Sequence, residues 1–151
     1  MYLGSYLRFL QQAERTRGDT FDQISAAHVD DADVYYATAS FARHCAAHVA
    51  ALADAVSRYH PTEPEPAHLH VPEPSPPRDG PLGLLRDLQD AYQLTHLVDL
   101  TWTLARQAAY GARDRDLIAT ADRCIPVTAS HLAWLRTHLS AAAPQTLLVA
   151  T

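Results

Sequence analysis

The most restrictive feature of the sequence is a proline-rich stretch near its middle. Seven of the ten prolines lie between residues 60 and 80. Proline has no amide hydrogen and its ring crowds the preceding turn, so this stretch cannot form a helix. In a polyproline II conformation it reaches about 60 Å, whereas a helix of about 27 residues is roughly 40 Å long. The stretch is therefore long enough to connect opposite ends of a helical bundle.

The sequence before this stretch has the spacing of two amphipathic helices. Mostly apolar residues recur in steps of four and three over residues 3–28 and again over residues 34–59. This spacing is typical of the buried face of helices that pack side by side. Gly18 interrupts the first run without shifting its phase, so we expect one continuous helix there. The acidic residues at positions 30–33 predict the start of the second helix, because carboxylates cap helix N-termini.

The sequence after the stretch predicts a second pair of helices. Pro81 suits the first turn of a helix, Gly111 suits its C-terminal cap, and Asp114 then caps a fourth helix. Pro126 should kink this last helix near its middle. The apolar tail at residues 147–149 is expected to dock on the bundle or on a partner.

These patterns together predict an all-α, antiparallel four-helix bundle. A chain of 151 residues has the length of one domain and can bury about 70% of the surface that it exposes when unfolded. We expect a single domain over residues 1–151, with a long crossover between the second and third helices at residues 60–80. The four helices are expected at about residues 2–28, 33–60, 81–110 and 114–141.

Charge and composition exclude several classes of function. The net charge of −5 disfavours nucleic acid and anionic membranes as partners, because both attract basic surfaces. All twelve basic residues are arginines, which excludes a Schiff-base lysine. No apolar run reaches the roughly 18 residues of a membrane helix, and no targeting segment is visible, so we expect a cytoplasmic protein. Two cysteines are too few for a disulfide framework, and free thiols are expected in that compartment.

Four stretches of sequence stand out, HVDDADV at residues 28–34, CAAH at 45–48, WTLARQAAYG at 102–111 and AAPQTLL at 142–148. In these stretches the chain resembles an uncharacterised bacterial branch of the ferritin-like superfamily. The resemblance implies two helical hairpins joined by one long crossover. It implies no particular activity.

The residues that would form a ferritin-like metal site are only partly present. A diiron site of this type needs a glutamate from each of two helices and a Glu-x-x-His pair from each of the other two. The sequence contains no Glu-x-x-His. At the expected positions stand Cys45 with His48 and Thr128 with His131, while the other two helices offer Glu14 and Asp99. The ligand set is therefore incomplete.

Two interpretations of these residues remain open. In the first, they form a hydrogen-bonded polar layer in the core, in which Arg17 replaces the charge of a metal and pairs with Glu14 or Asp99. In the second, some of them bind a transition metal ion, with zinc or copper favoured because thiolate and imidazole ligands are available. The candidate metal ligands are Glu14, Cys45, His48, Asp99, Cys124 and His131. The two cysteines are a further alternative, as a disulfide or redox pair.

The incomplete ligand set favours a protein that is not an enzyme. We expect a non-catalytic bundle without a cofactor that acts through self-association or through an unknown protein partner, with a homodimer as its state. The alternative is a metal-binding protein or a metal-dependent oxidoreductase that uses the residues at the middle of the bundle.

Overall fold

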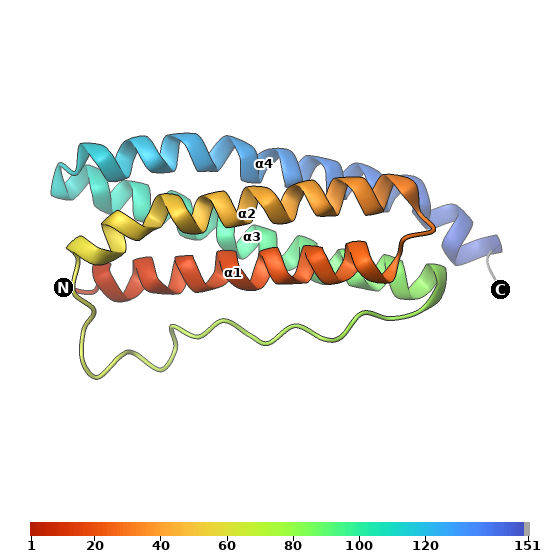
Figure 1. Cartoon of the computed structure of the whole chain (residues 1–151), viewed down its shortest axis with the longest axis horizontal. Coiled ribbons are helices and arrows are strands. Elements are labelled where there is room, and N and C mark those ends of the chain that lie inside the picture. The colour runs from red at the N-terminus through yellow and green to blue at the C-terminus, as the bar shows by residue number, and fades with distance from the viewer. Residues whose placement is uncertain (150–151) are drawn as a thin grey trace.

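The computed structural model of the chain describes residues 1–149, which form four long helices and no strand. The prediction of an all-α architecture with four helices is confirmed. Figure 1 shows the helices lying side by side along one axis. They are α1 (Leu3–Ala27), α2 (Ala32–Arg58), α3 (Gly80–Ala112) and α4 (Arg115–Pro144), and a short π-helix, η1 (Gln145–Val149), follows α4.

The four helices form two antiparallel hairpins. Helix α1 packs on α2 and α3 packs on α4, while α1 also contacts α3 and α2 also contacts α4. The helices therefore occupy the corners of a square in the order α1, α2, α4, α3. Residues 59–79 connect the two hairpins and run beside the bundle from one end to the other (Figure 1).

The predicted caps form at the starts of α2 and α4, but the predicted cap at the end of α3 does not. The carboxylates of Asp31 and Asp114 accept hydrogen bonds from the amides of Val34 (3.1 Å) and Leu117 (3.0 Å). The prediction of Gly111 as the cap of α3 is wrong, because the helix continues to Ala112 and the left-handed residue is Arg113, with φ of 54°. The turn must fall directly before Asp114, which begins the next helix, and this requirement overrides the preference of glycine for that conformation.

The last helix is longer than predicted. Helix α4 continues through Pro126 and ends at Pro144 rather than near residue 141. The side chains of Leu147, Leu148 and Val149 are all exposed, Leu148 to 83%. The tail contacts α3, but its apolar side chains are not buried on the bundle, and docking on a partner stays a prediction. Figure 1 shows the reason, since the extended α4 carries the tail beyond the end of the hairpin.

The core consists of two apolar clusters that follow one another along the axis. One cluster includes Leu10, Leu52 and Trp102, and the other includes Phe21 and Leu135. On α1 the two clusters are separated by one buried turn that carries charged side chains. This turn lies at the waist of the bundle, by which we mean the layer between the two apolar clusters.

The connecting segment is tied to the bundle at both of its ends. Near α2, Thr62 bonds to the Ser5 hydroxyl through its amide (2.8 Å) and to the Met1 carbonyl through its own hydroxyl (2.7 Å). Near α3, Arg78 donates to the buried carboxylate of Asp87 from its amide (2.9 Å) and from Nη1 (2.7 Å). These bonds hold an extended chain against the helices.

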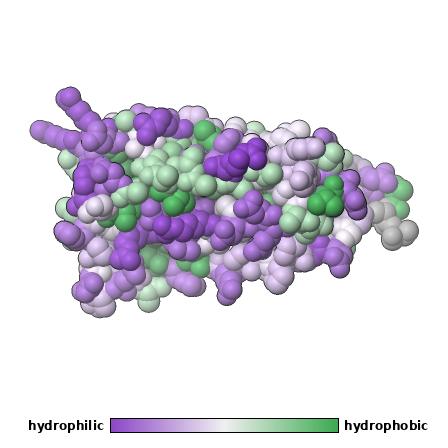
Figure 2. Space-filling view, in the orientation of Figure 1, coloured by the Kyte–Doolittle hydropathy of each residue, from purple (hydrophilic) through white to green (hydrophobic). Residues whose placement is uncertain are grey.

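The face that carries α1 and α2 is largely hydrophilic. Figure 2 shows a pale green area over the C-terminal half of α2, where Ala46, Ala47, Ala50 and Ala53 are exposed. These side chains are small and offer little apolar area. No helix within residues 1–149 combines the length and the apolar character that a membrane crossing requires.

Gly4 and Gly111 provide a matched test of this packing. A Cβ atom at Gly4 would lie 2.6 Å from the carbonyl carbon of His60, whereas one at Gly111 would meet nothing within 4 Å. We expect Gly4→Ala to lower the free energy of unfolding by about 1–3 kcal/mol through overpacking. Gly111→Ala should raise it by up to about 1 kcal/mol, because alanine favours the helix. Urea denaturation measures both, and equal effects would contradict the close packing at Gly4.

Candidate functional site

A buried ion pair on α1 occupies the waist of the bundle. Glu14 and Arg17 are three residues apart, so their side chains lie on the same face of the helix, and neither is exposed to solvent. Arg17 Nε donates to Glu14 Oε1 at 2.8 Å. Arg17 Nη2 lies 2.7 Å from the same oxygen, without the alignment of a hydrogen bond. The prediction that Arg17 pairs with a carboxylate in this layer is confirmed, and the partner is Glu14.

The second oxygen of Glu14 accepts hydrogen bonds from two other helices. His48 Nδ1 on α2 and Trp102 Nε1 on α3, the latter at 3.3 Å, both approach Oε2. A carboxylate has about four acceptor positions, so donors surround both oxygens of Glu14. Burial raises the pKa of Glu14, but the hydrogen bond from His48 and the charge of Arg17 outweigh it and hold this pKa below its usual value. Glu14 is therefore a carboxylate.

On its other side, Arg17 begins a chain of hydrogen bonds that leads to the surface. Arg17 Nη1 lies 2.8 Å from His131 Nδ1 on α4, and His131 Nε2 lies 2.8 Å from His44 Nδ1 on α2. Arginine only donates hydrogen bonds, so His131 Nδ1 must accept and its hydrogen must lie on Nε2. His44 Nδ1 therefore accepts in turn, and the exposed imidazole of His44 carries its hydrogen on Nε2.

Both imidazoles in this chain are neutral. Burial, with Arg17 nearby, lowers the pKa of His131 to about 2. The ring of Phe41 packs against that of His131 with centroids 4.1 Å apart. The pKa of His44 is also lowered, first by partial burial and then by the neighbouring charges of His48 and Arg43.

The structure brings three of the six candidate metal ligands into this network. Glu14 and His48 are in direct contact, and His131 joins them through Arg17. Asp99 is only half-buried, and its carboxylate makes no hydrogen bond or ion pair with any residue from 1 to 149. The neighbouring Val98 takes the fully buried position instead.

Neither cysteine takes part in the network. Cys45 and Cys124 are unpaired and belong to different apolar clusters. Burial raises the pKa of each thiol to about 12, so both remain protonated at neutral pH. A protonated thiol is a poor metal ligand and a poor nucleophile. Cys45 also packs against Gly18. A Cβ atom added at Gly18 would lie 3.2 Å from the Cβ of Cys45, so the glycine lets α1 and α2 approach closely.

Two members of the network are not among the residues that the sequence singled out as ligands. His44 lies one helical turn before His48, so the spacing of four residues placed it on the same side of α2. Tryptophan favours buried positions, and a buried indole N–H requires a hydrogen-bond partner, as Trp102 finds in Glu14. Both signals were present in the sequence.

The hydrogen-bond directions limit what this layer can do chemically. The oxygens of Glu14 and the inward nitrogens of the two linked imidazoles are all engaged as acceptors or donors. His48 uses Nδ1 for its bond to Glu14, and its Nε2 makes no hydrogen bond with any residue from 1 to 149. No three histidine, cysteine, aspartate or glutamate side chains within the described part of the chain are arranged to hold a metal ion.

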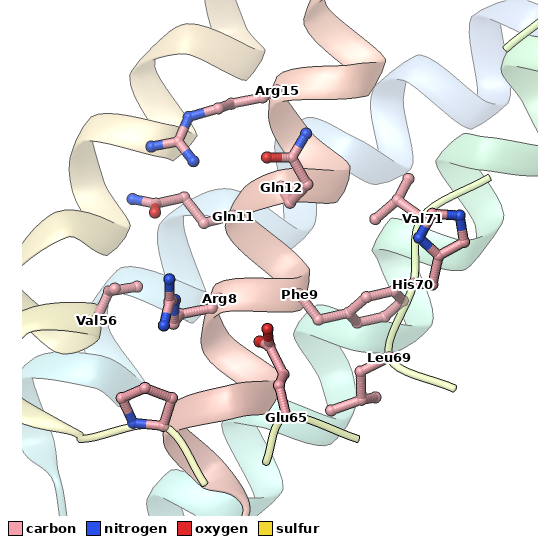
Figure 3. A pocket seen from close by; sticks show the side chains of 11 residues that line it. Arg8, Phe9, Gln11, Gln12, Arg15, Val56, Glu65, Leu69, His70 and Val71 are labelled. Atoms are coloured by element: carbon pink, nitrogen blue, oxygen red, sulfur yellow. The ribbon is translucent and has the colours of Figure 1, made fainter. Parts of the chain in front are cut away.

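A hollow of about 720 Å³ lies over the outer side of α1. Figure 3 shows Arg8, Gln11 and Arg15 on the side of α1 that faces α2, and Phe9 and His70 on the opposite side. Val56 lies on the side of the arginines, while Phe9, Leu69 and Val71 lie on the opposite side of α1 (Figure 3). They do not converge on one ligand, and the hollow is the space left under the connecting segment.

Comparison of the chain with family models, with curated proteins and with solved structures found no match.

The Glu14–Arg17 pair can be tested by a double-mutant cycle. Arg17→Met leaves a buried carboxylate without its main counter-charge, and we expect it to lower the free energy of unfolding by about 3–5 kcal/mol. Glu14→Gln should also be destabilising, because it leaves a buried guanidinium. The double variant should lose less than the sum of the two, measured by urea denaturation. Strictly additive losses would contradict the coupling.

Acid should destabilise the fold well above the range in which carboxylates titrate. The pKa of His131 is about 2 in the folded protein and near 6.5 when the chain is unfolded, so below pH 6.5 only the unfolded state takes up this proton. Stability must then fall as the pH falls. Between pH 7 and pH 5 the loss is about 2 kcal/mol, and Glu14 adds to it below its own usual pKa near 4.5.

The variant His131→Gln separates this contribution from the others. Its amide can still accept from Arg17 and donate to His44, but it does not titrate, so the change in stability between pH 7 and pH 5 should shrink. The control His68→Gln alters an exposed residue of the connecting segment and should leave the pH dependence unchanged. An identical profile for wild type and His131→Gln would refute the role of the buried imidazole.

Proposed function

We propose that this protein is a non-catalytic four-helix bundle of ferritin-like topology that acts by self-association as a homodimer. Two hairpins joined by one long connection support this topology. The paired state of the waist supports a structural role for it. Arg17 supplies from within the protein the positive charge that a metal ion supplies in a metalloprotein.

The observation that supports self-association is an exposed apolar stripe on α3. We define the α3 stripe as Leu97, Leu100, Leu104, Ala108 and Gly111, which recur in steps of three and four and therefore lie on one side of the helix. Leu100 is 58% exposed and Leu104 is 48% exposed. Helix α3 thus has two apolar sides, of which one faces the core and the other has no partner within residues 1–149.

A second copy of the same chain fits this stripe well. None of its residues is charged, so two stripes can meet without burying an unpaired charge. In a dimer with two-fold symmetry the same patch meets itself, and two α3 helices that cross antiparallel would bring the leucines of one copy against those of the other. The exposed alanines of α2, at positions 46, 47, 50 and 53, offer less apolar area than these leucines. We propose a cytoplasmic location for this dimer, with which the two unpaired, buried thiols are consistent.

Sedimentation of variants tests the proposal. We expect the wild type to sediment as a dimer, and Leu100→Asp with Leu104→Asp to sediment as a monomer that keeps its helical circular dichroism, because a charge on each copy would be buried without a partner. The matched control is Leu148→Asp, which places the same charge on the exposed tail. A monomeric wild type refutes the proposal. If only the tail variant dissociates the dimer, the contact is made by the tail and not by the α3 stripe, which also refutes it.

A further inference from the structure

The spacing of the α3 stripe is symmetric about Leu104. Leu100 and Ala108 lie four residues before and after it, and Leu97 and Gly111 lie seven residues before and after it. Positions four and seven residues away lie on nearly the same side of a helix that has 3.6 residues per turn. A two-fold axis through Leu104 and perpendicular to α3 would therefore place each position of the stripe opposite its counterpart in a second, antiparallel copy.

The two halves of the α3 stripe differ in the size of their side chains. The half before Leu104 carries Leu97 and Leu100, whereas the half after it carries Ala108 and Gly111. In the antiparallel arrangement Leu97 faces Gly111 of the second copy, and Leu100 faces Ala108 of the second copy. Each large side chain then meets a small one. A parallel arrangement would instead press leucines against leucines at one end and leave a gap at the other, which close packing disfavours.

The glycine at the end of the α3 stripe is not required by the packing of a single chain. Gly111 is exposed and lies inside α3, and the left-handed residue that ends the helix is Arg113. A Cβ atom at Gly111 would meet nothing within 4 Å. Alanine would stabilise the helix better than glycine. A glycine at such a position is expected where another helix approaches closely, because it leaves the most room.

We propose that Gly111 and Ala108 leave room for Leu97 and Leu100 of a second copy, so that two α3 stripes pack antiparallel with Leu104 on the two-fold axis. This inference rests on the homodimer proposed above and adds its register. Leu100 and Leu104 of the two copies then lie next to one another around the axis. A shift by one helical turn in either direction would separate Leu97 from the glycine that it faces, so side-chain size selects one alignment.

An exchange of side-chain sizes tests the proposed contact. Gly111→Leu fills the space for Leu97 of the second copy, so the dissociation constant of the dimer should rise roughly tenfold or more in sedimentation equilibrium. The fold should keep its stability, because a side chain at this position has open space around it. Adding Leu97→Ala to Gly111→Leu again pairs one large with one small side chain and should restore most of the affinity. The control Ala53→Leu adds the same bulk to an exposed position of α2 and should leave the dissociation constant unchanged.

Disulfide formation reports the register directly. Leu104→Cys should form a linked dimer with oxidised glutathione, because residues on the axis come within the roughly 7 Å between Cα atoms that a disulfide allows. Leu97→Cys and Gly111→Cys should each stay unlinked alone and become linked only when the two variants are mixed and exchange subunits. The control Leu82→Cys lies exposed on α3 outside the stripe and should stay unlinked. The two native cysteines are buried and do not compete.

The outcomes separate this inference from the dimer on which it rests. A monomeric wild type overturns both. If Leu100→Asp with Leu104→Asp dissociates the dimer but Leu97→Cys alone becomes linked, the stripes pack parallel and only the register is overturned. The register is also overturned if Gly111→Leu leaves the dissociation constant unchanged, or if Leu97→Ala does not restore the affinity that Gly111→Leu has lost.

Discussion

The buried pair of Glu14 and Arg17 sets the conditions that every neighbouring group at the waist must meet. Two charges removed from water are tolerated only when hydrogen bonds satisfy the remaining donors and acceptors. Here the partners come from the other three helices, through His48, Trp102 and His131. One ion pair on α1 thereby fixes how all four helices face each other, while the apolar clusters on either side supply the bulk of the buried area.

Much of the fold could be predicted because its signals are local. The period of each helix and the caps at Asp31 and Asp114 follow from the residues themselves. The exceptions depend on neighbours. Arg113 rather than Gly111 ends α3, because the start of α4 determines where the turn must fall. The exposure of Leu148 depends on where α4 ends. The residues of the tail do not indicate this position.

For the candidate site, the sequence predicts how far along each helix a side chain lies but not in which direction around the helix axis it points. A residue's position along a helix follows from its number, and Glu14 and His48, both near the middle of their helices, are in contact. Each residue also turns the side chain by about 100° around the axis, so the neighbouring residues Val98 and Asp99 cannot both face inward. Packing selected Val98. The same uncertainty hid His44, which lies beside the inward side of α2 rather than on it and reaches His131 from the surface.

The order of groups between His44 and Glu14 has a consequence for proton movement. Protons hop along hydrogen bonds only when each member can both release one and take one up. A guanidinium keeps its protons at any pH that a protein survives. With Arg17 between the imidazoles and the carboxylate, hopping inward from His44 stops at His131. The hydrogen bonds from His44 to Glu14 are continuous, but they do not conduct protons from solvent to the interior. Glu14 therefore does not exchange protons with solvent along this path.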